Sequence, residues 1–199
     1  PAFHRDPFRR TLPTQVLECT PKGEGLWHIT LEATLLYPTG GGHPHALGTL
    51  NGIPVEGVER LDGRIVHTLS QEIPEGADVE VTLDWARRLD HMQQHTAQHL
   101  LTALIQDRLG PASVSWHLGD SYTSIELATP DPPDLETLQA WVYELILGDL
   151  QVTTHLVAPD EIPENVRTRG LPQGVRGPIR LVEIPGVDGN TCGGTHVAR

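Results

Sequence analysis

WARRLDHMQQHTAQHLLTALIQDRL, residues 85–109, is the stretch that divides the chain into its parts. It contains neither Gly nor Pro, and apolar residues recur in it at helical spacing. Asp84 precedes the stretch as a candidate N-cap, and Gly110-Pro111 ends it. The pattern therefore predicts one long helix over residues 85–109. Its buried side is expected to carry Leu89, Met92, Thr96, Leu100 and Ala103.

The sequence on the N-terminal side of this helix has the pattern of a β domain. Residues 14–83 alternate apolar and polar positions, contain many β-branched residues and are often broken by Gly. Asn51-Gly52 and Asp62-Gly63 are dipeptides typical of hairpin turns. Short strands at such close spacing are typical of a small barrel or sandwich. We therefore expect a small β-barrel-like domain over residues 1–83, interrupted by the glycine-rich YPTGGGHPH of residues 37–45.

The sequence on the C-terminal side mixes helices and strands. SVSWHLG and YTSIELA have the pattern of strands, and a second helix is predicted over residues 135–147 with Asp134 near its cap. QVTTHLVA and GPIRLVEI are two further strand candidates, and the last stretch, PGVDGNTCGGTHVAR, is rich in glycine. These elements predict an α/β domain over residues 84–199 and an α+β fold class for the chain.

The composition narrows the classes of function. The 199 residues include 14 basic and 26 acidic side chains, which gives a net charge of −12. A protein that holds nucleic acid through broad phosphate contacts is usually basic, so a nucleic-acid partner must be met here by local basic patches. No apolar run approaches the roughly 18–20 residues that span a bilayer, and the start PAFHRDPFRR lacks the features of a signal peptide. We therefore expect a cytoplasmic protein without a membrane partner.

Two pairs of side chains suggest a metal site. His95 and His99 stand at i and i+4 on the predicted helix, so both imidazoles point to the same side. Cys192 and His196, in CGGTH, are also four residues apart, and the two glycines between them allow the backbone to curl tightly. One thiolate and three imidazoles form a tetrahedral donor set that zinc prefers. The four residues therefore predict a zinc site that joins distant parts of the second domain.

Other interpretations of the same residues stay open on this reasoning. His91 lies one turn before His95, so these two form an alternative histidine pair. HMQQH looks superficially like a zincin motif, but Met92 occupies the place of the glutamate base, which counts against a metalloprotease. Cys192 and His196 could instead serve as a nucleophile and its base.

Three motifs, taken together, resemble a known family. YPTGGGHP, HTAQHLL and CGGTHV are similar to motifs that occur in this order in the editing domain of alanyl-tRNA synthetases and in its free-standing relatives, the AlaX-type alanyl-tRNA editing proteins. The chain resembles a free-standing member from about residue 15 to its end. The resemblance implies a β-barrel-like domain followed by an editing domain similar to the second additional domain of threonyl- and alanyl-tRNA synthetases. It also implies that one Zn²⁺ per chain is bound by His95, His99, Cys192 and His196, with His91 outside the set.

The resemblance further implies an activity and a partner. A member of this family is a trans-editing hydrolase that deacylates mischarged tRNA(Ala), chiefly Ser-tRNA(Ala) and in some members Gly-tRNA(Ala). Because the ester is labile, positioned water and a stabilised oxyanion suffice, and no covalent step is required. Four ligands favour a closed zinc site that holds the shape of the pocket, whereas three would leave an open position for water. The side chains that we consider for positioning the water are Gln94, Gln98, Thr195 and His91.

The glycine-rich loop is the predicted contact with the substrate. Thr39 is our candidate for binding the hydroxyl that distinguishes serine from alanine, because a site built to bond a hydroxyl rejects the analogue that lacks it. The backbone at Gly40, Gly41 and Gly42 can approach a substrate closely, and His43 completes the predicted substrate-binding set.

The sequence departs from the family pattern at two positions of this loop. His43 stands where the family usually has Gln, and Ala46 stands where it has Asp. Together with the acidic charge, these departures motivate an alternative function, a zinc-containing tRNA- or protein-binding module that has lost hydrolysis. A zinc hydrolase acting on a small ester or amide is a third hypothesis. Whether the protein is a monomer or a homodimer stays open.

Overall fold

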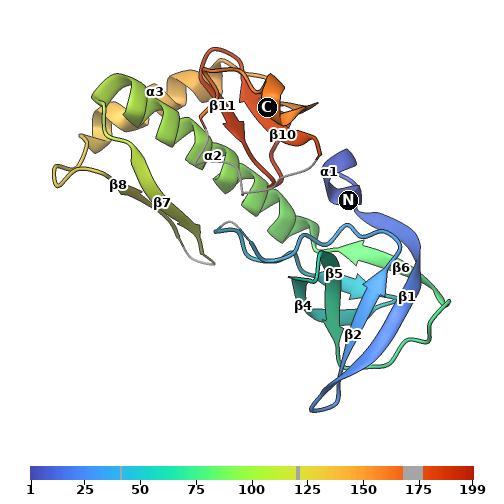
Figure 1. Cartoon of the computed structure of the whole chain (residues 1–199). Coiled ribbons are helices and arrows are strands. Elements are labelled where there is room, and N and C mark those ends of the chain that lie inside the picture. The colour runs from blue at the N-terminus through green and yellow to red at the C-terminus, as the bar shows by residue number, and fades with distance from the viewer. Residues whose placement is uncertain (41, 120–121, 168–176) are drawn as a thin grey trace. The chain divides into compact units, whose positions relative to one another are not determined.

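The computed structural model describes residues 1–40, 42–119, 122–167 and 177–199. The chain forms two compact units, Pro1–Met92 and Gln93–Arg199. The division falls inside helix α2 (Trp85–Leu109), which has the bounds predicted from the sequence. Figure 1 shows the strands of the first unit, and the helices with two small sheets of the second. The chain therefore has the mixed α+β character expected from its sequence.

The first unit is built around a closed barrel in which the strand order is β1-β2-β5-β4-β3-β6. Neighbouring strands are antiparallel throughout. Both predicted hairpins are confirmed, since Asn51 and Gly52 have φ of 49° and 83°, and Asp62 and Gly63 have φ of 48° and 79°. Two consecutive residues with positive φ are what a type I′ turn requires. The elements are α1 (Ala2–Arg5), β1 (Thr11–Gly23), β2 (Leu26–Leu31), β3 (Gly48–Leu50), β4 (Ile53–Leu61), β5 (Arg64–Leu69) and β6 (Asp78–Leu83).

Alternating side chains build the core of the barrel. In β6, Val79, Val81 and Leu83 are buried, while Glu80 and Thr82 between them are exposed. Successive side chains of a strand point to opposite faces, so the same pattern on each strand fills the interior with apolar groups. The other buried residues of this core include Val16, Ile29, Leu36, Leu50, Val58 and Leu69.

The first turns of α2 pack with the barrel. The carboxylate of Asp84 accepts a hydrogen bond from the backbone N–H of Arg87 at 3.1 Å, which confirms the predicted N-cap. Trp85 packs against the barrel core, and the buried guanidinium of Arg88 donates to the carbonyl of Leu35 at 2.6 Å. The first compact unit therefore extends past the start of the helix. The functional boundary predicted at Asp84 follows the change from strand to helix and stays a prediction.

The second unit combines the rest of α2 with a second helix and two small sheets. Its elements are β7 (Ser113–Leu118), β8 (Thr123–Leu127), α3 (Leu135–Leu147), β9 (Thr153–Val157), η1 (Pro159–Glu161), β10 (Ile179–Ile184) and β11 (Asp188–Thr191). β7 pairs with β8, and the other three strands form an antiparallel sheet in the order β11-β10-β9. Leu104 and Ile105 of α2 pack with Leu138 of α3. In the described ranges, no helix has both the length and the apolar character needed to cross a bilayer.

Candidate metal centre

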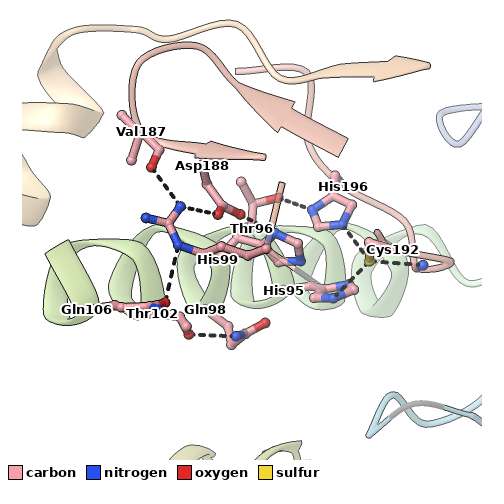
Figure 2. A network of polar contacts seen from close by, with 12 residues as sticks. His95, Thr96, Gln98, His99, Thr102, Gln106, Val187, Asp188, Cys192 and His196 are labelled. Carbon is pink, nitrogen blue, oxygen red and sulfur yellow. Dashed lines mark hydrogen bonds and ion pairs between the residues drawn. The ribbon is translucent and has the colours of Figure 1, made fainter. Parts of the chain in front are cut away.

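Four potential ligands come together in the second unit. His95 and His99 lie on successive turns of α2, whereas Cys192 and His196 belong to the segment that follows β11 (Figure 2). Their ligand atoms all lie within 4.8 Å of one another. The three histidines are buried and Cys192 is half-buried. Two pairs that are far apart in the sequence thus converge on one point.

The spacing of these atoms fits a tetrahedral metal ion. The sulfur of Cys192 lies 3.3 Å from Nε2 of His196 and 3.6 Å from Nε2 of His95. Zinc bonds of about 2.3 Å to sulfur and about 2.0 Å to nitrogen, at the tetrahedral angle, place sulfur and nitrogen about 3.5 Å apart. The four residues could therefore hold a metal ion with little rearrangement.

Hydrogen bonds at Nδ1 orient two of the imidazoles. Nδ1 of His99 lies 2.8 Å from Oδ2 of Asp188, and Nδ1 of His196 lies 3.1 Å from the hydroxyl of Thr96. An ionised carboxylate can only accept, so His99 carries a proton at Nδ1 and donates it to Asp188. A partner at Nδ1 fixes the ring with Nε2 directed at the site, which is how ligating histidines are commonly held.

The cluster favours a thiolate paired with an imidazolium when no metal is bound. Burial opposes ionisation of Cys192, but hydrogen bonds from the three histidines bring the pKa of the thiol well below its usual range. Burial also opposes the charge on His99, yet its bonds to Asp188 and Cys192 raise the pKa of the imidazole to about 9. The pKa of His196 falls to about 3, chiefly because the ring is buried. A thiolate is the form of cysteine that binds metal, so the site holds its sulfur ready for that role.

Gly194 allows the segment after β11 to pass close to His95. A Cβ at Gly194 would lie 2.2 Å from Cε1 of His95 and 2.5 Å from its Nδ1, which is closer than real side chains approach. A Cβ at Gly193 would meet no atom of the described residues within 4 Å. Neither glycine has a positive φ. Close approach to the imidazole, rather than a left-handed turn, is therefore what requires glycine at position 194.

Arg180 of β10 holds the same segment. Its Nη1 donates to the carbonyls of Cys192 and Gly194 at 2.9 and 2.8 Å. The backbone N–H of Cys192 donates to the carbonyl of Arg180 at 3.0 Å, and the N–H of Gly194 donates to the Cys192 sulfur at 3.3 Å. The position of the sulfur is thus set by β10, the middle strand of the sheet.

His91 does not belong to the cluster of ligand atoms. In the first unit its buried ring makes an edge contact with His43, with 5.1 Å between the ring centroids. The alternative pair of His91 and His95 therefore has no support in the geometry. In the second unit, His95 stacks on Trp116 with 4.7 Å between centroids and 23° between planes, which fixes the plane of the imidazole.

The other side chains considered for positioning water differ in their surroundings. Gln94 accepts a hydrogen bond from the hydroxyl of Thr123. Gln98 donates to Oγ1 of Thr102 at 2.8 Å (Figure 2). Thr195 is fully buried, and within the described part of the chain its hydroxyl has no hydrogen-bond partner. A buried hydroxyl left unpaired costs about 1–3 kcal/mol, so a ligand or water that pairs with it gains stability.

The predicted substrate-contact loop lies in the first unit. It comprises Thr39, Gly40, Gly41, Gly42 and His43, of which Gly41 lies outside the described residues. Gly40 and His43 exchange backbone hydrogen bonds of 3.0 and 3.1 Å, and Gly42 has a φ of 79°. The hydroxyl of Thr39 lies 3.4 Å from Nδ1 of His45. Contact of this loop with substrate stays a prediction.

The two positions that depart from the family pattern are buried in the first unit. Ala46 is 3% exposed and belongs to the barrel core. His43 is also 3% exposed, packs against Tyr37 with 4.7 Å between centroids, and donates from Nδ1 to the carbonyl of Pro44 at 2.7 Å. Both side chains therefore contribute to the packing of the first unit.

Sequence reasoning missed the residues that orient the ligands. Thr96 was expected only as part of the buried helix face, and no role at the metal site was predicted for Asp188 or for its partner Arg167. The available signal was a carboxylate four residues before Cys192 in a glycine-rich segment. Such an Asp is common in turns, so the pattern by itself does not indicate a role at a metal.

Comparison with known proteins agrees with the motifs. No family model matches the chain. The chain is 42% identical over 208 residues to the alanyl-tRNA editing protein Aarsd1 of Danio rerio, covering 98% of the chain and 50% of that protein. It is 32% identical over 205 residues to the alanyl-tRNA editing protein AlaX-L of Pyrococcus horikoshii, with the same two coverages. With the alanine–tRNA ligase of Thermoplasma acidophilum it shares 33% identity over 208 residues, which is 98% of the chain and 23% of the ligase.

The similarity runs through both units, and the chain spans about half the length of the editing proteins it matches. Identity of this degree over nearly the whole chain, with the ligand pairs in place, leads to one conclusion. The chain belongs to the AlaX family of alanyl-tRNA editing proteins.

Proposed function

We propose that this protein is a cytoplasmic deacylase that removes the wrong amino acid from mischarged tRNA(Ala), chiefly from Ser-tRNA(Ala) and also from Gly-tRNA(Ala). One observation carries the proposal. His95, His99, Cys192 and His196 form a set able to hold a metal ion in a chain whose relatives are named alanyl-tRNA editing proteins. The names imply an editing reaction, and the choice of serine as the main target is our inference.

We propose Zn²⁺ as the metal, one ion per chain. A single thiolate with three neutral imidazoles suits zinc, because carboxylate or water oxygens, which magnesium and calcium need, are not among the four ligand atoms. Bound zinc would supply Lewis-acid character and, with all four ligands engaged, would mainly hold the shape of the site.

The chain's own side chains then have to place the ester and the water. Hydrolysis adds water across the ester bond and releases the free amino acid and the ribose hydroxyl. Thr195 supports this step best, because its buried hydroxyl has no partner among the described residues. We assign it to hold the attacking water or the ester carbonyl. Gln94 and Gln98 are the other candidates, and each would have to share or exchange its bond to a neighbouring threonine.

Thr39 is our proposal for recognising the serine hydroxyl. Its own hydroxyl lies 3.4 Å from Nδ1 of His45, near the outer limit of a hydrogen bond, so the present pairing is weak and exchangeable. A polar group that gains a proper partner only with serine discriminates against alanine, which would leave the group unpaired.

Deacylation of purified mischarged tRNA tests the proposal. The protein is mixed with tRNA(Ala) charged with serine, glycine or alanine, and release of each amino acid is followed with and without a zinc chelator. We expect fast release of serine, slower release of alanine, and loss of serine release after metal removal. Equal rates for serine and alanine would contradict the proposed specificity, and no release of serine by zinc-loaded protein would contradict the activity.

A pair of cysteine variants separates this function from its alternatives. C192A removes a ligand, whereas C19A changes the half-exposed cysteine of the barrel unit and serves as the matched control. We expect zinc content and deacylation to fall together in C192A and to stay normal in C19A. Retained tRNA binding without hydrolysis in the zinc-loaded wild type would favour the binding module. Hydrolysis of minimal aminoacyl esters without tRNA would favour a small-ester hydrolase.

A further inference from the structure

Asp188 lies between a ligand of the metal site and an arginine. One carboxylate oxygen is 2.8 Å from Nδ1 of His99 (Figure 2). The other is 2.8 Å from Nη1 of Arg167. The side chain of Asp188 is 2% exposed and that of His99 is 5% exposed. Both carboxylate oxygens of Asp188 therefore have partners, and the pair of side chains is almost inaccessible to solvent.

Arg167 is itself firmly held. Its Nη1 also donates to the carbonyl of Val187 at 3.2 Å, and its Nη2 pairs with the carboxylate of Asp107 on α2. Its backbone N–H donates to the carbonyl of Gly189 at 2.7 Å, which ties it to β11 beside Asp188. The guanidinium thus approaches the carboxylate from one fixed direction and offsets the cost of burying its charge.

The two oriented histidines of the site differ in the kind of partner at Nδ1. His196 has the neutral hydroxyl of Thr96, which also accepts a hydrogen bond from the N–H of Val197 at 3.3 Å. His99 has an ionised carboxylate, and charge-assisted hydrogen bonds are about twice as strong as neutral ones. The orientation of His99 is therefore the more strongly enforced.

We propose that Asp188, backed by Arg167, is the positioning residue that fixes His99 with Nε2 toward the metal. The proposal rests on the metal site of the proposed function and adds the residue that sets its geometry. A carboxylate at this place accepts the Nδ1 proton, so the only nitrogen left for coordination is Nε2. Without it, the ring is free to rotate or to carry its proton at Nε2, where it would block the metal.

Two variants of Asp188 and one control test this role. D188A removes the acceptor. D188N keeps the shape of the side chain but replaces one carboxylate oxygen by NH₂. The amide turns its NH₂ either toward Nδ1–H of His99 or toward the guanidinium of Arg167, and in both orientations one hydrogen-bond donor faces another. D107N is the matched control, because Asp107 pairs with the same arginine at an exposed position and does not contact His99. Zinc dissociation constants are measured by competition with a chromophoric chelator, and the tautomer of His99 by nitrogen NMR of the imidazole.

We expect zinc affinity to fall about 10- to 100-fold in D188A and about 10-fold in D188N, with little change in D107N. The NMR signals of His99 should lose the Nδ1–H pattern in both Asp188 variants. Wild-type zinc affinity in D188N would overturn the proposal, and so would an unchanged His99 tautomer. Because D188N keeps the buried volume of the side chain, it still provides the test if D188A does not fold. Zinc content and serine release of the wild type are measured alongside. A wild type that holds zinc while D188N holds it equally well refutes this inference alone, whereas a zinc-loaded wild type without serine release refutes the proposed function alone.

Discussion

Replacement of Gly194 by alanine should strongly weaken zinc binding through a single methyl group. The new Cβ would lie 2.2 Å from Cε1 of His95, whereas ordinary van der Waals contact begins at 3.4 Å. Either the ring or the backbone must therefore move by about 1.2 Å, the difference between the two distances. The ring is confined by its stack on Trp116, and the backbone is held by Arg180, so neither can shift without breaking other contacts.

The size of the effect follows from the geometry of coordination. A ligand displaced by this amount is lost, because metal–ligand distances vary only by about 0.2 Å. Four-ligand zinc sites bind with about 10–16 kcal/mol, so one ligand contributes about 3 kcal/mol. We therefore expect the dissociation constant for zinc to rise about 100-fold in G194A.

The neighbouring glycine supplies the control for this experiment. G193A adds the same methyl group one residue earlier, where it meets nothing within 4 Å. Zinc competition against a chromophoric chelator should give a wild-type dissociation constant for G193A and a much weaker one for G194A. A G194A protein that binds zinc as tightly as G193A would refute the claim that His95 is a ligand held in this position.

Three further predictions concern other residues. H99A should hold less zinc by elemental analysis and release serine more slowly, because it removes one of the four potential ligands. T195V should leave the urea-unfolding free energy unchanged or slightly higher, since it removes an unpaired buried hydroxyl, while slowing serine release; normal release would exclude Thr195 from the reaction. Acid should destabilise the first unit through His67, because burial lowers the pKa of its imidazole to about 4 in the folded chain. The contribution of His67 to the free energy of unfolding is then fully present above about pH 6.5, the pKa of histidine in the unfolded chain. It declines by about 2–3 kcal/mol as the pH falls from 6.5 to 4. An H67Q variant should lose that decline when urea unfolding is compared at pH 7 and pH 4.5.

The parts of the fold that local rules determine could be predicted from the sequence. The bounds of α2 follow from a stretch without Gly or Pro between a capping Asp84 and Gly110-Pro111. The two hairpins follow from dipeptides that tolerate positive φ. The pairing of His95 with His99 follows from helical periodicity. In each case the residues concerned lie within a few positions of one another.

The contacts that orient the ligands could not be predicted in the same way. Asp188 meets His99 across 89 positions of sequence, and Arg167 reaches Asp107 across 60. Which carboxylate faces which ring depends on how β11 packs on α2, and that is a property of the folded unit rather than of any local pattern. The need for glycine at position 194 is of the same kind, because it arises from the ring of His95 on a distant element.

The two departures of the loop from the family pattern have a packing role in the first unit. Ala46 fills part of the barrel core, and His43 packs between Tyr37 and His91 with its Nδ1 bonded to a neighbouring carbonyl. Burial of this kind shows what these side chains contribute to the packing of the first unit. In the second unit the four potential ligands come together, and the hydroxyl of Thr195 has no hydrogen-bond partner among the described residues. An experiment on the second unit can separate an editing enzyme from a binding module: a zinc-loaded T195V protein that binds tRNA but releases serine slowly would support a part for Thr195 in the reaction.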